Sequence, residues 1–87
     1  MTYAVFIKAS ALKALARLPK ADQARLRARI DGLATEPRPQ GVAKLAGEGN
    51  LYRLRAGDYR IIYEIRDDVL QVLVISIGHR REVYRRR

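Results

Sequence analysis

Arginines gather in the C-terminal half of this sequence at spacings that suit the binding of phosphate groups. Arg53 and Arg55 alternate along an apolar stretch, and Arg60 follows after a short turn-forming segment. A guanidinium group is a planar fork of N–H donors that matches two oxygens of a phosphate. A second apolar stretch ends in a glycine, and four more residues capable of binding or acid–base chemistry come after it: His79, Arg80, Arg81 and Tyr84.

The usual catalytic signatures are absent from the sequence. It has no cysteine, one histidine, no suitably placed pair of carboxylates, no glycine-rich loop before a helix and no set of metal ligands. Catalysis by this chain would therefore use no metal and no cofactor, and would depend on arginine. Phosphoryl chemistry suits such residues, because positioning and charge neutralisation supply much of its rate. On RNA, the nucleophile can be the substrate's own 2′-hydroxyl.

The net charge favours a polyanionic partner. Eighteen Lys and Arg residues against nine Asp and Glu leave a formal charge of +9, which attracts polyanions at long range. Nucleic acid is the leading candidate. An acidic protein is second and compatible with the first, and a membrane surface is third, because no expected helix has a bulky apolar face. The alternative is that the arginines pair with acids such as Glu64, Asp58 or Glu82.

His79 has two interpretations. Its imidazole titrates near neutral pH and is able to act as a general base. The commoner role for a histidine at a strand end is structural, with the ring hydrogen-bonded to the backbone.

The expected compartment is the cytoplasm. The first residues lack the charged leader and long apolar region of a signal peptide, and no apolar run approaches the roughly 20 residues that a membrane-spanning helix needs. The lack of cysteine fits a reducing environment. We expect one domain covering residues 1–87, with no membrane partner.

The N-terminal half predicts a strand and a helical hairpin. Tyr3 to Lys8 alternates like a strand, and Ser10 is a suitable N-cap for a helix from Ala11 to Leu18. Leu12, Leu15 and Leu18 are expected to form its apolar stripe. Pro19 ends that helix and starts a second one, which runs to about Ala34 or Thr35. The second helix carries three arginines, interpreted as a solvated face: Arg25, Arg27 and Arg29.

The C-terminal half predicts an antiparallel meander. A proline-rich linker and a short strand or irregular segment at residues 42–45 lead into three strands: Leu51–Arg55, Tyr59–Ile65 and Val69–Ile77. Two tight turns join them, so each pair must be antiparallel. Period-two alternation places Arg53 and Arg55 on one face, with Arg60 near Arg55 on the paired strand. Gly78 is expected to end the last strand. The fold class is α+β, with two helices packed on an antiparallel sheet.

Two blocks of this sequence resemble a known toxin family. YRLRAGDYRIIY at residues 52–63 and VISIGHRREVY at residues 74–84 closely resemble the RelE branch of the RelE/ParE toxin superfamily. The similarity covers nearly the whole chain. It implies a type II toxin–antitoxin toxin that cuts messenger RNA in the ribosomal A site, with contacts to 16S rRNA, and that a cognate antitoxin inhibits. In that family the 2′-hydroxyl attacks the adjacent phosphate and leaves a 2′,3′-cyclic phosphate.

The resemblance also implies site residues. Arg55, Arg60, Arg80 and Tyr84 match the catalytic positions. Arg55 and Arg60 would stabilise the transition state, Arg80 the leaving 5′-oxygen, and Tyr84 would take the 2′ proton. RNA binding would involve five residues: Arg53, Arg55, Arg60, Arg81 and His79. The chain departs from some relatives in a shorter segment between Gly78 and Tyr84, and Arg81 is an alternative to Arg80.

Two other functions fit the same scaffold. A ParE-like toxin would inhibit DNA gyrase without nuclease chemistry, and a catalytically inactive homologue would act only as a binding module. The simultaneous presence of Arg60, Arg80 and Tyr84 favours the nuclease.

Overall fold

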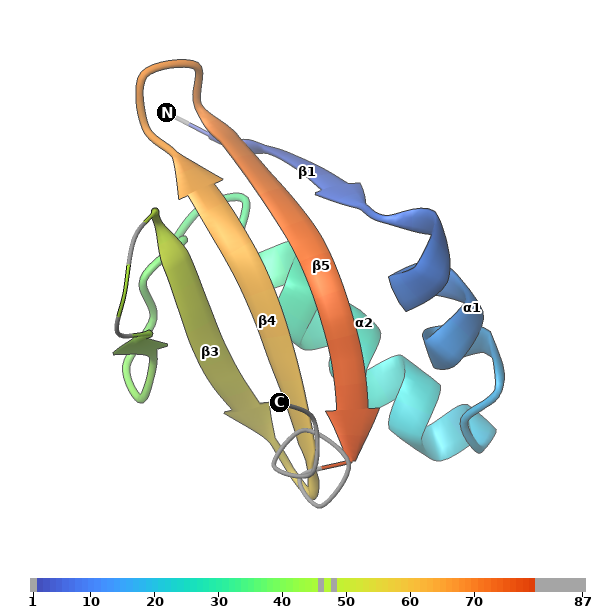
Figure 1. Ribbon diagram of the computed structural model, residues 1–87. Coiled ribbons are helices and arrows are strands. Elements are labelled where there is room, and N and C mark those ends of the chain that lie inside the picture. Colours follow the sequence, from blue (N-terminus) through green and yellow to red (C-terminus); the bar gives the residue numbers. More distant parts are fainter. Residues whose placement is uncertain (1, 46, 48, 80–87) are drawn as a thin grey trace.

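Two helices lie against one face of a five-stranded sheet, which is the α+β architecture that the sequence predicts (Figure 1). The computed structural model describes residues 2–45, 47 and 49–79. Its elements follow the order β1 (Ala4–Ile7), α1 (Ala9–Ala16), α2 (Lys20–Gly32), β2 (Ala43–Lys44), β3 (Leu51–Ala56), β4 (Tyr59–Arg66) and β5 (Gln71–His79). In this described part, no helix is long and apolar enough to cross a membrane.

The sheet is mixed: it contains the antiparallel meander that the sequence predicts and a parallel pair that involves the N-terminal strand, whose partner the sequence did not indicate. Its strand order is β1-β5-β4-β3-β2, and β3, β4 and β5 form the predicted antiparallel meander. β1 instead pairs in parallel with β5, with Val5 opposite Val72. The tight turns of the meander impose antiparallel pairing on their own strands. No such turn joins β1 to β5, because the helices and three other strands separate them in the chain.

The first helix begins earlier than expected, and Ser10 is not its cap. α1 starts at Ala9, directly after β1, with Lys8 at the N-cap position and no side-chain capping bond. The Lys8 N–H donates to the Val74 carbonyl, 2.8 Å away, so the last bond of the parallel pair sets the start of the helix. Ala11 and Leu15 therefore face the core, whereas Leu12 is 45% exposed. The predicted stripe was wrong at Leu12.

The last strand continues through the glycine that was expected to end it. β5 runs from Gln71 to His79, and β4 supplies partners to its end, because Arg60 lies opposite Gly78 and Tyr59 opposite His79. Pairing with β4 thus outweighs the local tendency of glycine to break a strand. At its other end β5 starts later than predicted, because Val69 belongs to the turn after β4 and is 51% exposed.

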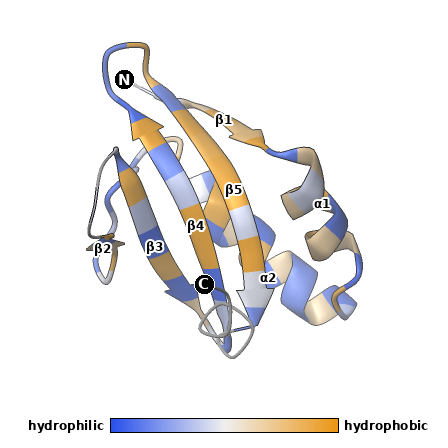
Figure 2. Ribbon diagram, in the orientation of Figure 1, coloured by the Kyte–Doolittle hydropathy of each residue, from blue (hydrophilic) through white to orange (hydrophobic). Residues whose placement is uncertain are grey.

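The hydrophobic core fills the layer between the helices and the sheet. Leu26 and Ile30 of α2 and Leu33 after it are buried, against the inward-facing residues of the central strands. Figure 2 shows hydrophobic and hydrophilic residues alternating along β3, as expected for a strand with one covered face. The opposite face of β3 is consequently available to carry polar groups.

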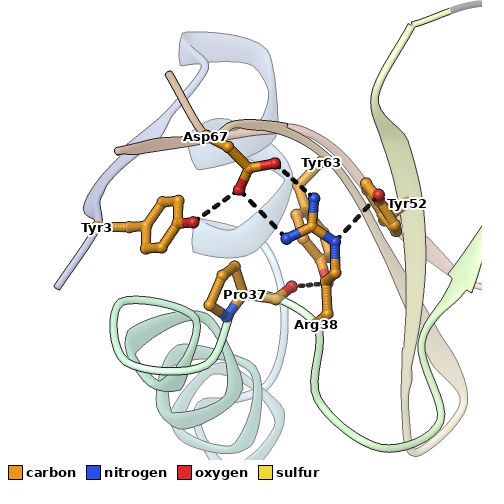
Figure 3. A network of polar contacts seen from close by, with 6 residues as sticks. All are labelled: Tyr3, Pro37, Arg38, Tyr52, Tyr63 and Asp67. Atoms are coloured by element: carbon orange, nitrogen blue, oxygen red, sulfur yellow. Dashed lines mark hydrogen bonds and ion pairs between the residues drawn. The ribbon is translucent and has the colours of Figure 1, made fainter. Parts of the chain in front are cut away.

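A polar network attaches the linker after α2 to one end of the sheet (Figure 3). The Arg38 guanidinium donates to both carboxylate oxygens of Asp67, at 2.8 and 3.2 Å, and its Nε donates to the Tyr52 hydroxyl at 3.1 Å. The Tyr3 hydroxyl donates to the same carboxylate at 2.6 Å. Arg38 also lies over the Tyr52 ring, 5.2 Å from its centroid. These contacts fix the path of the linker toward β2.

Tyr63 adds a buried anchor to this linker. Its hydroxyl donates to the Pro37 carbonyl at 2.8 Å, and its ring stacks on Tyr52 with centroids 6.0 Å apart. Burial raises the pKa of Tyr63 to about 12. The phenol therefore stays protonated at neutral pH and keeps donating to the linker.

Acid is expected to weaken this network through Asp67. Hydrogen bonds from Arg38 and Tyr3 lower the pKa of Asp67 from its usual 3.8 to about 2. The carboxylate therefore stabilises the fold above about pH 4, and that contribution is lost as the pH falls toward 2. Chemical unfolding at a series of pH values should show a smaller acid-induced loss in Asp67→Asn than in wild type. Asp68→Asn removes a carboxylate from the same turn as a control, and an equal effect of both variants would contradict the prediction.

Candidate nucleic-acid interface

The alternation of β3 places Arg53 and Arg55 on the sheet face away from the helices. Tyr52, Leu54 and Ala56 are buried toward the core, whereas Arg53 is half-buried and Arg55 is exposed. This confirms the predicted facing of the strand. The two guanidinium groups leave the same face of an edge-proximal strand, where they are accessible to a ligand.

The hairpin between β3 and β4 sets Arg55 directly opposite Arg60. Gly57 adopts a positive φ of 64° in a turn of two residues, Gly57 and Asp58. The resulting register pairs Arg55 with Arg60, as the sequence predicts. Like charges directly opposite one another on paired strands destabilise a sheet. An anion bound between them would offset that repulsion.

Arg60 is buried although it carries a charge. It is 4% exposed, the one charged side chain among the buried residues of the described chain. Its other cross-strand neighbour is Gly78, which contributes no side chain beside it. Water screens a buried guanidinium less than an exposed one. Its attraction to a nearby phosphate is therefore stronger.

Four arginines line one pocket, which we call the arginine pocket. It has a volume of about 380 Å³, and its described lining residues are Arg29, Gln40, Gly41, Ala43, Arg53, Leu54, Arg55 and Arg60. None of these is acidic. Of the acids considered as partners from the sequence, Glu64 pairs with Arg66 at 3.6 Å, outside the pocket. The pocket therefore concentrates positive charge, as an anion-binding site requires.

Arg29 was not among the site residues expected from the sequence. It is exposed on α2, in keeping with its interpretation as part of a solvated face, and it also lines the arginine pocket. The sequence around Arg29, in the last turn of α2, does not indicate that this side chain reaches β3, because the contact depends on how the helix crosses the sheet.

His79 lies apart from the arginine pocket. Its ring meets Tyr59 edge-on, with centroids 5.7 Å apart and an interplanar angle of 82°. Both residues line a different pocket of about 390 Å³, together with Arg17 and Leu18. The Tyr59 hydroxyl donates to Asp22 of α2 at 3.2 Å. His79 is thus placed beside the helices rather than with Arg53 and Arg55.

Three predicted site residues lie outside the described residues. These are Arg80, Arg81 and Tyr84. Within the described chain, no group of three or more His, Cys, Asp or Glu side chains is arranged to hold a metal ion.

A family model for the ParE toxin of type II toxin–antitoxin systems (parDE) matches residues 5–84. The chain belongs to this toxin family. A RelE-like toxin protein of Escherichia coli is 32% identical over 82 residues, covering 92% of this chain and 85% of that protein. The chain is therefore a RelE-like toxin of a toxin–antitoxin system, and the resemblance drawn from its two sequence blocks is confirmed.

Solved structures agree with this placement of the toxin. RelE in the RelE–RelB complex from Pyrococcus horikoshii has a TM-score of 0.83 and 40% identity, covering 92% of this chain and 97% of that one. A free E. coli RelE mutant has a TM-score of 0.77 and 30% identity, covering 98% and 93%. The fold predicted from the sequence is thus that of RelE structures.

Proposed function

We propose that this toxin is a ribosome-dependent, metal-independent endoribonuclease that cuts messenger RNA in the ribosomal A site. The supporting observation is the arginine pocket, in which Arg55 and buried Arg60 face each other across a hairpin with no acidic side chain among the described lining residues. Such a site suits a phosphate whose negative charge grows during the reaction. Its resemblance to RelE supplies the substrate class.

The proposed reaction is an internal transfer on the RNA. The substrate's 2′-oxygen attacks the adjacent phosphorus, the bond to the 5′-oxygen breaks, and a 2′,3′-cyclic phosphate and a free 5′-hydroxyl result. Arg55 and Arg60 neutralise the charge that develops on the non-bridging oxygens, and Arg53 binds the RNA backbone. On the family pattern, Tyr84 accepts the 2′ proton and Arg80 stabilises the leaving oxygen. Arg81 and His79 are assigned to RNA binding.

The proposed partners are a cognate antitoxin and the ribosome. RelE relatives have been solved in complex with RelB antitoxins, including those of Pyrococcus horikoshii and E. coli. A formal charge of +9 on this chain suits both an acidic antitoxin segment and 16S rRNA. We place the toxin in the cytoplasm, where both partners would meet it, and treat residues 1–87 as one toxin domain.

Gyrase inhibition is the second candidate function. It is favoured by the matching family model, which describes the ParE toxin. An inactive homologue that only binds its antitoxin is a third possibility for the same scaffold.

Cleavage on translating ribosomes distinguishes these functions. We expect the purified toxin to cut messenger RNA only when ribosomes are present, with sites mapped by primer extension, and to retain this activity in a chelator. Added cognate antitoxin should abolish the cuts. A gyrase supercoiling defect without RNA cleavage would establish the second function instead. If the folded toxin neither cleaved RNA nor inhibited gyrase, the third function, an inactive binding module, would be supported.

A further inference from the structure

Arg29 reaches the arginine pocket from the helical layer. The other described lining residues belong to the linker after α2 or to strands β2, β3 and β4. Arg29 is near the C-terminal end of α2, between buried Leu26 and Ile30, so packing of the helix holds its backbone in place. The roles given to Arg53, Arg55 and Arg60 leave this fourth cation without a function.

The pocket includes a part of β3 with which no described residue of β2 pairs. In the described residues, β2 pairs only with Tyr52 and Arg53, so the edge is open from Leu54 to Ala56. The Leu45 N–H donates to the Leu51 carbonyl at 2.9 Å, which shows that Leu51 directs its main-chain groups toward β2. Every second residue does the same in an antiparallel ladder. Arg55 therefore presents its backbone N–H at the open edge, beside its own guanidinium.

These groups form a second set of phosphate donors next to the proposed reaction centre. One set is the opposed pair of Arg55 and Arg60 on the sheet face. The other is the Arg29 guanidinium together with the Arg55 N–H at the strand edge. A volume of about 380 Å³ is within the range of ligand pockets, so it has room for more than a single phosphate. An RNA backbone, with a phosphate at every nucleotide, would occupy both sets at once.

We propose that Arg29 is a substrate-positioning residue that binds an RNA phosphate adjacent to the scissile one, at the open edge of β3. This proposal rests on the nuclease function given above. It predicts that Arg29 acts mainly on substrate binding, because the phosphate it holds is not the one that reacts. The fork of an arginine suits this task better than the point charge of a lysine.

Arg27 provides a matched control on the same helix. It is exposed like Arg29, and its loss changes the net charge by the same amount. Residues two apart on a helix do not share a face, and Arg27 does not line the arginine pocket. A difference between Arg29→Ala and Arg27→Ala therefore reports the local contact rather than long-range attraction.

Binding of a short 2′-O-methyl RNA, which cannot be cleaved, measures the contact without the reaction. By fluorescence anisotropy over a series of salt concentrations, Arg29→Ala should bind about tenfold more weakly than Arg27→Ala, with a salt slope lower by about 0.7, the value of one phosphate contact on a single strand. Arg29→Lys should fall between wild type and Arg29→Ala. On ribosomes, Arg29→Ala should raise KM more than it lowers kcat, and thermal unfolding should be the same for both alanine variants.

The outcomes separate this role from the nuclease function. Equal RNA binding by Arg29→Ala and Arg27→Ala, or no binding of this RNA by wild type, would overturn the role of Arg29. So would a loss of binding that matches a loss of folded protein. Arg29-dependent RNA binding without any ribosome-dependent cleavage would refute the nuclease function and keep the phosphate contact.

Discussion

Replacing Arg60 with alanine is expected to reduce ribosome-dependent RNA cleavage by at least ~100-fold, the effect of removing one preorganised donor from a transition-state site. Arg60 is 4% exposed and lies directly opposite Arg55 in the arginine pocket. Solvent cannot screen it as it screens an exposed cation. The loss should fall on kcat as well as kcat/KM, since the charge it meets grows in the transition state.

Arg66→Ala is the control for this prediction. Arg66 lies on the same strand, at its far end, where it is exposed and pairs with Glu64 at 3.6 Å. Its loss removes the same charge and should leave cleavage within about twofold of wild type, because exposed ion pairs contribute little. Arg60→Lys keeps a buried cation and tests whether the fork itself is needed. Full cleavage by a folded Arg60→Ala toxin would remove Arg60 from the reaction.

The part of this site that follows from the sequence is the part made by one hairpin. Alternation with period two determines which face Arg53 and Arg55 occupy, and a two-residue turn containing Gly57 sets the register that brings Arg60 opposite Arg55. Both are local properties. The resemblance to RelE added the identity of the family, which such local patterns do not contain.

The features that sequence reasoning missed depend on contacts between distant segments. The parallel pairing of β1 with β5 joins residues 4–7 to residues 71–74, and the approach of Arg29 to β3 depends on how α2 crosses the sheet. The bond from Arg38 to Asp67 joins residues 29 positions apart. Gly78 was expected to end a strand, and its pairing with Arg60 on β4 keeps it in the ladder. In each case a long-range partner decides between local alternatives.

Replacing Leu26 with alanine is expected to lower the free energy of unfolding by about 3 kcal/mol, within the range for buried leucines. Leu26 is fully buried at 0% exposure, where α2 packs on the sheet. A domain of this size has a total stability on the order of 5–10 kcal/mol, so the variant should show a clearly lower denaturation midpoint. The cost combines lost burial with the cavity left between helix and sheet.

Leu12→Ala makes the same chemical change at an exposed helical position and should cost about 0.5 kcal/mol or less. Leu12 is 45% exposed on α1, so no cavity forms when its side chain is shortened. Urea unfolding of both variants measures the difference, and an equal m-value would show that the same surface is exposed on unfolding. If Leu26→Ala cost no more than Leu12→Ala, the helix–sheet interface that holds Arg29 over the edge of β3 would not be packed as described. Arg29 would then lack the rigid support that positioning an RNA phosphate requires.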